Sequence, residues 1–328
     1  MEQIISKRRL RFWFKLILMI LLLGGGITGG YKLHELGSKV GCFQLPENVV
    51  PINIKLLNSD TIRFIALGDT GTSDEEQHKV ANGMAQVCKS SGCDMVLMLG
   101  DNFYDDGLKS YMDTQFESKF VNVYNEINKP FFAVLGNHDI RWDALSQVMH
   151  SIDSDKWRMP NYEYSFKTET ARFFGINTSC PFSSERLRNY LDIDDSEYVK
   201  DEAARPWTIA FGHHSVFSNG THGDTDFFTR LYWDWFLEGR VDLYLSGHNH
   251  HLAHLQHGNI PTEYVVSGAG AKHYRSASER ERLNKSEALS KFTYNDTGFV
   301  WIEISSHKLY FSMHDSDGNV LYEYTKTR

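Results

Sequence analysis

One pattern recurs five times along the chain and constrains its fold more than any other feature. Each time, a short apolar run ends at a glycine, and a side chain that can bind a metal ion follows. Apolar runs of about 4 to 8 residues are typical of buried strands, and glycine lets the backbone turn sharply where a strand ends. The pattern therefore predicts a sheet whose strand ends converge on one polar site. The five glycines are Gly68, Gly100, Gly136, Gly212 and Gly247.

The segments between these motifs predict the fold class. Residues 73–89 carry apolar side chains at helical spacing, and Ser73 followed by Glu76 predicts a capping box at the start of that helix. A second helix is expected over 110–127, and strand-like alternation over 264–324. Strands that alternate with helices favour parallel pairing and right-handed crossovers, so we expect an α/β protein. The expected strands are residues 62–67, 95–99, 131–135, 207–211 and 241–245.

The polar residues behind the strands are of metal-binding types. In α/β sheets, ligand sites lie outside the carboxyl ends of the strands, where loops converge. Burial of so many polar groups without partners would cost about 2–7 kcal/mol each. We therefore expect a metal site built from several loops. The polar residues that follow the five glycines are Asp69, Asp101, Tyr104, Asn137, His138, Asp139, His213, His214, His248 and His250.

Taken in order, the elements Gly-Asp, Gly-Asp, Gly-Asn-His, Gly-His and Gly-His-x-His resemble the calcineurin-like metallophosphoesterases. Within that superfamily the chain resembles the purple acid phosphatases, because Tyr104 stands three residues after Asp101. Residues 207–222 and 247–270 resemble the small, mammalian-type branch, which includes the tartrate-resistant enzymes. The resemblance covers roughly residues 60–315. It implies a four-layer α/β sandwich, with two mixed β-sheets packed together and helices on the outer faces.

The resemblance also implies a binuclear metal centre. Phenolate and carboxylate oxygens suit ferric iron, whereas neutral amide and imidazole ligands suit a divalent ion. The expected cofactor is Fe(III) together with Fe(II), Zn(II) or Mn(II). The first metal would be bound by Asp69, Asp101, Tyr104 and His250, and the second by Asp101, Asn137, His213 and His248.

The implied function is that of an acid phosphatase, which hydrolyses phosphate monoesters by attack of a metal-bound hydroxide on phosphorus. The resemblance assigns His138 and His222 to contact with the substrate and to proton donation to the leaving group. Asp139 would orient His138, as carboxylates often do for functional imidazoles. A purely structural interpretation of each residue stays open: His222 could be a solvated loop histidine, and Asp139 could be a residue that caps its own loop.

The chain departs from the family pattern after His213. The small branch usually has an aromatic residue and then proline there, whereas this chain has His214 and Ser215. These changes put the substrate preference and the pH optimum in doubt, but not metal binding. Three further histidines follow the last motif and are expected to belong to a strand and loop face without a catalytic role: His251, His254 and His257.

Two other functions compete with this interpretation. Another member of the superfamily, such as a phosphodiesterase, nucleotidase or phosphoprotein phosphatase, commonly lacks the ligand at Tyr104 and has a histidine in the first motif, where this chain has Thr70. A catalytically inactive binding or anchoring protein would be expected to have lost a ligand. Every expected ligand position in this chain is filled by the expected residue type.

The amino-terminal segment predicts export. A basic flank at residues 7–11 precedes an apolar stretch at 12–31, which is just long enough to span a bilayer. Residues 1–31 are therefore expected to be a signal-anchor or a cleaved signal peptide, followed by a linker (32–60) and the phosphoesterase domain (61–328). The domain would be extracytoplasmic (secreted, periplasmic or in an endomembrane lumen), with the membrane as a partner if the segment stays uncleaved. A net charge of -8 argues against nucleic acid as a partner.

Overall fold

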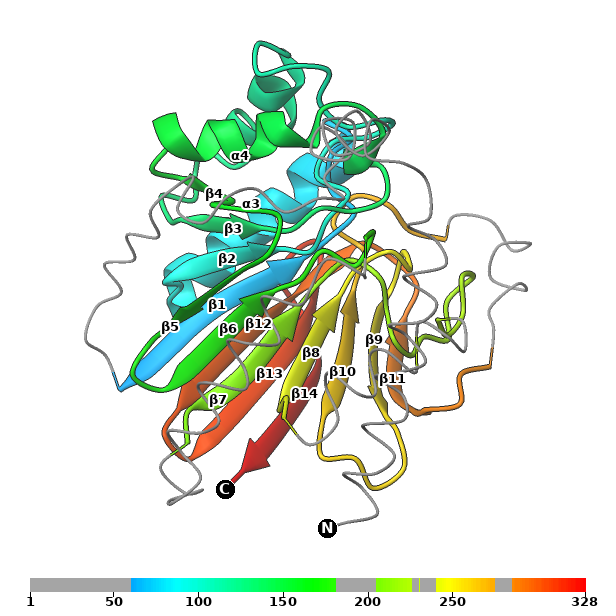
Figure 1. Cartoon of the computed structure of the whole chain (residues 1–328). Helices are drawn as coiled ribbons and strands as arrows, with labels where there is room; N and C mark the ends of the chain where they lie inside the picture. The colour runs from blue at the N-terminus through cyan, green and yellow to red at the C-terminus, as the bar shows by residue number, and fades with distance from the viewer. Residues whose placement is uncertain (1–59, 181–204, 226–229, 231–239, 275–284) are drawn as a thin grey trace, which may run out of the picture.

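The computed structural model describes residues 60–180, 205–225, 230, 240–274 and 285–328. The expected amino-terminal segment 1–31 and nearly all of the linker 32–60 lie outside these residues. Two seven-stranded β-sheets form the body of the described part (Figure 1). None of the helices in the described ranges has the length and apolar character needed to cross a bilayer.

The first sheet is mixed. Its strands β1, β2, β3 and β4 run parallel to one another, and β12, β13 and β14 add to the other side of β1 in antiparallel order. The strand order is β14-β13-β12-β1-β2-β3-β4. The bounds are β1 (Thr61–Leu67), β2 (Met95–Met98), β3 (Phe131–Ala133), β4 (Trp157–Arg158), β12 (Gly298–Ser305), β13 (Lys308–Asp315) and β14 (Val320–Thr327).

The second sheet is also mixed. Strands β6, β7, β8 and β10 are parallel; β5 pairs antiparallel with β6, β9 pairs antiparallel with β10, and β11 pairs antiparallel with β9. The strand order is β11-β9-β10-β8-β7-β6-β5. The bounds are β5 (Tyr164–Lys167), β6 (Ala171–Gly175), β7 (Trp207–Phe211), β8 (Leu243–Ser246), β9 (Leu252–Gln256), β10 (Glu263–Ser267) and β11 (Leu289–Tyr294).

Alternation along the strands divides the apolar core into layers. Phe64 of β1 packs between the two sheets, against residues such as Phe173 and Leu243 of the second sheet. Its neighbour Ile65 faces the other way, toward the helices. Because the buried strands are apolar on both faces, each sheet requires cover on its outer side. The expected packing of two mixed sheets in an α/β fold is confirmed.

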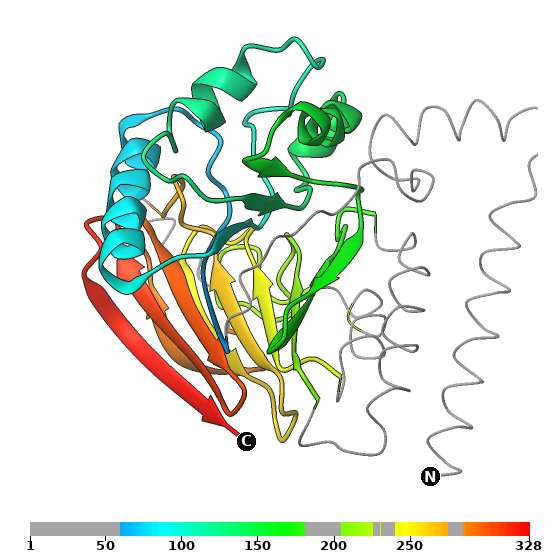
Figure 2. The ribbon, with the colours of Figure 1, turned by 90° about the vertical axis from the view of Figure 1, so that its left-hand side faces the viewer.

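Two helices cover the outer face of the first sheet (Figure 2). They are α3 (Glu75–Ser91) and α4 (Ala144–Asp153). Val80 and Met84 of α3 and Val148 of α4 are fully buried against that sheet. Full burial of such a side chain contributes about 1.5–3 kcal/mol. The second sheet carries a separate apolar cluster on its other face, which includes Phe174 and Tyr244.

Two local predictions were wrong. Asp74, and not Ser73, caps α3, because its carboxylate accepts a hydrogen bond of 3.1 Å from the backbone N–H of Gln77. The long helix expected over 110–127 is largely turns around a short π-helix, η1 (Glu117–Val121). There the carboxylate of Asp113 accepts bonds from the N–H groups of Lys109 and Gln115, which offers the backbone an alternative to helix.

Candidate metal centre

The loops behind β1, β2, β7 and β8 meet at one end of the two sheets. Asp69, Asp101 and His248 adopt positive φ angles of 59°, 53° and 67°. This conformation is uncommon for residues other than glycine, and here it turns the side chains inward. The neighbouring glycines leave the necessary room: a Cβ on Gly136 would lie 2.1 Å from Oδ1 of Asp101, and one on Gly247 would lie 2.6 Å from Oδ2 of Asp69.

A first group of donor atoms comes from Asp69, Tyr104 and His250. The Tyr104 hydroxyl donates to Oδ1 of Asp69 over 2.9 Å and lies 3.5 Å from Nε2 of His250. Nε2 of His250 in turn lies 3.4 Å from Oδ1 of Asp69. One carboxylate oxygen, one phenol oxygen and one ring nitrogen therefore point at the same place.

A second group of donor atoms surrounds Nε2 of His213. This nitrogen lies 3.1 Å from Oδ1 of Asn137 and 3.3 Å from Nδ1 of His248. His213 is completely buried. Its other ring nitrogen, Nδ1, lies 2.9 Å from the carbonyl oxygen of Leu99, which fixes the ring with Nε2 toward the cluster.

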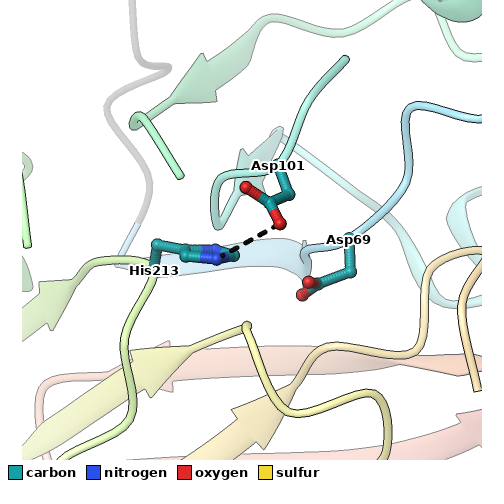
Figure 3. Close-up of side chains that lie close together, drawn as sticks. All are labelled: Asp69, Asp101 and His213. Atoms are coloured by element: carbon teal, nitrogen blue, oxygen red, sulfur yellow. Dashed lines mark ion pairs between the residues drawn. The ribbon is translucent and has the colours of Figure 1, made fainter. Parts of the chain in front are cut away.

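Asp101 joins the two groups. Its Oδ2 lies 3.4 Å from Nε2 of His213, and its charge helps to raise the pKa of the Tyr104 phenol, after burial and the carboxylate of Asp69. Asp69, Asp101 and His213 each offer a ligand atom, and these atoms all lie within 4.8 Å of one another (Figure 3). All of the ligands expected for either metal therefore lie together, with Asp101 between the two groups.

The arrangement fits a pair of cations. Nε2 of His213 and Nδ1 of His248 face each other at 3.3 Å, beside a carboxylate and an amide oxygen. Ring nitrogens and oxygens that converge in this way have lone pairs directed at a common point, as metal ligands do. The donor set of carboxylates, a phenol, an amide and imidazoles is of the kind that binds iron, zinc or manganese.

Charge within the cluster reinforces this fit. Burial acts to raise the pKa of Asp101, but the neighbouring imidazoles of His213 and His138 hold it below its ordinary value. Burial acts to lower the pKa of His213, yet the carboxylate of Asp101 raises it to about 9. In the absence of metal, a proton on His213 thus partly neutralises the buried carboxylates. A bound cation would take over that task.

His138 lies at the mouth of the centre. Its backbone N–H donates to Oδ1 of Asp101 over 2.9 Å, and its Nε2 lies 3.9 Å from the other oxygen of that carboxylate. Its Nδ1 contacts the backbone carbonyl of Asp105. Nδ1–H is therefore the donor to Asp105, and Nε2 is the nitrogen left to face a substrate.

Asp139 does not play the part that we expected for it. Its buried carboxylate accepts hydrogen bonds from the N–H groups of Asn102, Phe103 and Gly136, at 3.1, 3.1 and 2.8 Å. None of the hydrogen bonds recorded for the described residues joins it to His138. Burial, together with the nearby carboxylate of Asp101, raises the pKa of Asp139 to about 7. Asp139 thus ties the loops behind β2 and β3 together, which is the loop-capping alternative.

His222 lies beside the second group of donor atoms. Its ring stacks on that of His248, with the centroids 4.2 Å apart. Its backbone N–H donates to Oδ1 of Asn249 over 3.0 Å. Our sequence reasoning gave no role to Asn249, although its place between two expected ligands was a usable signal. Asn249 is almost completely buried, and its side chain holds the neighbouring loop through the bond to the His222 N–H.

Thr178 is a second residue that sequence reasoning missed. Its hydroxyl oxygen accepts hydrogen bonds from the N–H groups of His213 and His214, at 3.1 and 2.9 Å. It also lies 2.9 Å from Nδ1 of His214. Burial lowers the pKa of His214 to about 3, and the nearby His213 contributes to that shift. No motif follows β6 in the sequence, so Thr178 carried no signal of its own.

The departures from the family pattern are accommodated inside the fold. The hydroxyl of Ser215 donates to the carbonyl of Gly247 over 3.1 Å, and so joins the loops behind β7 and β8. The three later histidines lie outside the donor cluster. His251 bonds to Asn219, His254 lies within β9 and bonds to Glu263, and the ring of His257 stacks on Phe217.

The sequence of this fold and centre matches a known family. The model of the calcineurin-like phosphoesterases matches residues 62–252, which is more than half of the chain. Purple acid phosphatase 17 of Arabidopsis thaliana is 31% identical over 296 residues, which cover 82% of this chain and 85% of that relative. The chain belongs to the calcineurin-like phosphoesterases, in their purple acid phosphatase branch.

Other purple acid phosphatases and related folds extend the comparison. Tartrate-resistant acid phosphatase type 5 of Homo sapiens is 27% identical over 294 residues, covering 80% of this chain and 90% of the relative. Among solved structures, "GAP50 the anchor in the inner membrane complex of Plasmodium" shares the fold with a TM-score of 0.69, at 23% identity, over 81% of this chain and 89% of that one. As a purple acid phosphatase, the chain is a hydrolase of phosphate esters, and its family implies a binuclear metal centre.

Proposed function

We propose that this purple acid phosphatase hydrolyses phosphate monoesters at acid pH with Fe(III) and a divalent Fe, Zn or Mn ion. One observation carries the proposal: two groups of donor atoms share the buried carboxylate of Asp101. The group of Asp69, Tyr104 and His250 contains the anionic oxygens that suit ferric iron. The group around His213 contains the neutral ligands that suit a divalent ion.

The chain's own residues would hold the two cations and keep bulk water away from one side of the site. A pair of cations held there would supply an activated water molecule and would compensate the charge of the phosphoryl group. Asp101 would keep the two cations close together, and Leu99 and Thr178 would keep His213 in its orientation. Leu99 and Val134, which come shortly before Asp101 and Asn137 in sequence, are fully buried in the apolar layer between the sheets, and that layer would exclude water from this side of the site.

The two histidines at the mouth would act on the substrate. Nε2 of His138 points away from its anchoring contact with Asp105 and toward the carboxylate of Asp101. His222 lies beside the second group of donor atoms, where its ring stacks on that of His248. Burial and the nearby His250 lower the pKa of His222 in the metal-free protein, so the ring would carry a proton for donation only at acid pH. Such an imidazole suits proton donation to a leaving alkoxide.

His222 and the leaving group offer a direct test of that role. His222→Ala should reduce kcat for alkyl phosphates about 10²-fold or more, and should reduce it far less for p-nitrophenyl phosphate, whose leaving group needs no proton. His257→Ala serves as the matched control, because His257 lies outside the donor cluster. Equal losses on both substrates would exclude the proton-donor role.

The main competing activity is phosphodiester hydrolysis. The experiment is to load the purified protein with iron and zinc, and to compare p-nitrophenyl phosphate with bis-p-nitrophenyl phosphate between pH 4 and 8. Faster monoester hydrolysis with an acid optimum supports the proposal. Preference for the diester, or no hydrolysis of either ester by protein with both metal sites filled, would refute it.

The location of the enzyme belongs to the same proposal. The basic and apolar pattern of residues 7–31 supports export across a membrane, with the domain on the extracytoplasmic side. A fusion of residues 1–60 to a reporter that is active only after export tests this directly. Activity that persists when residues 12–31 are deleted would contradict it.

A further inference from the structure

Charged side chains border the metal centre, and the roles proposed above use none of them. Arg141 ends the short helix η2 (Asp139–Arg141), and Lys272 follows β10. Nη2 of Arg141 lies 3.5 Å from Nε2 of His138. Nζ of Lys272 lies 4.7 Å from the ring centroid of Tyr104. The rings of His138 and Tyr104 contact each other with centroids 4.5 Å apart, so both cations border the same corner of the centre.

Arg141 is held in a way that leaves one of its nitrogens available. Nη1 donates to the backbone carbonyl of Asp105 over 3.1 Å and to the carboxylate of Asp106 over 3.0 Å. The side chains of Arg141 and Asp106 are 45% and 51% exposed, and such surface ion pairs contribute about 0–1 kcal/mol. These two bonds fix the guanidinium, while Nη2 points toward His138. Nη2 carries two N–H groups: one faces Nε2 of His138, and the other has no partner among the described residues, so an incoming anion can bind it.

Lys272 adds a second positive charge. Within the part of the chain that the structure describes, this partly exposed lysine forms no ion pair. Near it, the ammonium of Lys119 contacts the backbone carbonyl of Tyr104. Burial lowers the pKa of Lys119, the carboxylates of Asp105 and Asp113 oppose that shift, and Lys272 adds to it. The rim therefore has three cations beside three carboxylates, which are those of Asp105, Asp106 and Asp113.

The positions of these cations separate them from the reacting phosphoryl group. Nε2 of His138 lies 3.9 Å from Oδ2 of Asp101, the carboxylate that both donor groups share. Nη2 of Arg141 contacts the same nitrogen, Nε2 of His138, over 3.5 Å, and none of the bonds that Arg141 makes within the described residues goes to a donor atom of the cluster. A phosphoryl group bound at the metals would meet His138 first. Arg141 and Lys272 would meet the remainder of the substrate.

We propose that Arg141 and Lys272 form a second anion subsite, which favours phosphate esters that carry a carboxylate or a second phosphate near the reacting group. A guanidinium presents its N–H groups in a plane that matches carboxylate and phosphate oxygens, and an ammonium adds a point charge. This proposal rests on the proposed phosphatase function and specifies the class of substrate that the enzyme would prefer.

The test compares two substrates that differ by one charge. Glycerol 3-phosphate and 3-phosphoglycerate have the same kind of leaving group, but only the second carries a carboxylate. In the metal-loaded protein, KM should be lower for 3-phosphoglycerate. Arg141→Gln and Lys272→Gln should each raise that KM about 5- to 10-fold, with kcat and the KM of glycerol 3-phosphate changed less than about twofold. Pyrophosphate, as a third substrate, tests a second phosphate in the same way.

Lys308→Gln is the matched control. It removes the same charge from β13 at the opposite end of the first sheet, where Lys308 pairs with Glu303 over 2.9 Å. This variant should leave every KM unchanged. A KM increase confined to 3-phosphoglycerate, or to pyrophosphate, supports the subsite and identifies its anion.

Two results would overturn the subsite while leaving the phosphatase function intact. One is a parent enzyme that shows no preference for the doubly anionic substrates. The other is an Arg141→Gln variant whose kcat/KM falls equally on all three substrates, glycerol 3-phosphate included. That result would make Arg141 a positioning residue for His138. Failure of the parent protein to hydrolyse any of the three would instead refute the proposed function itself.

Discussion

Oδ2 of Asp101 lies 3.4 Å from Nε2 of His213, although the two residues follow strands of different sheets. Asp101 follows β2 of the first sheet, and His213 follows β7 of the second. The candidate centre therefore exists only when the two sheets are packed together. Ions bound there would link the sheets at one end, beyond the apolar layer that joins them elsewhere.

Metal removal should therefore destabilise the whole fold. A ligand that binds only the folded state stabilises it by about 4 kcal/mol at a concentration a thousand times its Kd. We expect chelation to lower the midpoint of thermal unfolding by several degrees, and added iron and zinc to restore it. An unchanged midpoint after complete metal loss, checked by elemental analysis, would show that the centre does not couple the sheets.

Replacement of the shared carboxylate should affect both metal sites. Asp101→Ala removes the carboxylate that lies between the two donor groups, so the occupancy of both metals should fall. Activity should fall by more than about 10²-fold, the usual effect of losing one stabilising group in an active site. Asp317→Ala is the control, because that exposed carboxylate pairs with Lys79 on the surface. Loss of a single metal, with the other fully retained, would contradict the shared role of Asp101.

Tyr104 should give the oxidised protein its colour. In the metal-free protein, burial and the adjacent carboxylate of Asp69 raise the pKa of the phenol, so a ferric ion is needed to hold it as phenolate. The expected signature is a visible charge-transfer band that Tyr104→Phe abolishes, while the divalent metal stays bound. Tyr162→Phe removes another buried tyrosine hydroxyl and should keep the band. A band that survives in Tyr104→Phe would exclude Tyr104 as the ligand.

Asn249 should position His222 without binding metal. Its Oδ1 accepts the His222 N–H over 3.0 Å, and its side chain is almost completely buried. Asn249→Ala leaves that N–H without its partner, which costs about 1–3 kcal/mol, and kcat for alkyl phosphates should fall about 10-fold. Asn249→Asp keeps an acceptor oxygen and should recover part of the loss. Metal content should be normal in both variants; a large metal loss would make Asn249 a structural support of the ligands instead.

Sequence reasoning predicted residues that the fold brings together, because each stands within four residues of a glycine that ends a strand. Asp101 and His213 could be placed together from topology alone, since the carboxyl ends of parallel strands share an edge. Sequence reasoning could not predict roles that depend on the direction in which a side chain points. Asp139 was expected to orient His138, but its two carboxylate oxygens accept hydrogen bonds from the backbone N–H groups of Gly136 and Phe103. Thr178 stands in a loop without any motif.

A buried pair far from the metals should make the fold sensitive to acid. His254 is fully buried, with Nε2 2.9 Å from Oε2 of Glu263 and Nδ1 3.0 Å from the hydroxyl of Tyr322. Burial lowers the pKa of His254, and its bond to Glu263 offsets this only in part. Below the ordinary histidine pKa of about 6.5, His254 is therefore protonated in the unfolded chain but stays neutral in the folded chain. The free energy of unfolding must then fall as the pH falls, by at most about 1.4 kcal/mol per pH unit for this group.

Denaturant unfolding of the metal-free protein at pH 7, 6 and 5 measures this slope. His254→Gln should have a lower free energy of unfolding at pH 7, because glutamine fills the space of the imidazole and replaces its hydrogen bonds only in part. Its free energy of unfolding should, however, fall less steeply toward pH 5. Glu263 does not confuse the comparison: burial acts to raise its pKa, but the bonds from His254 and Tyr324 hold it below its ordinary value, so its own contribution is lost only at lower pH. The exposed His307, replaced by Gln, is the control and should keep the parental slope. Parallel slopes for the parent and His254→Gln would mean that His254 takes up its proton inside the folded protein, and that the ion pair with Glu263 outweighs the cost of burial.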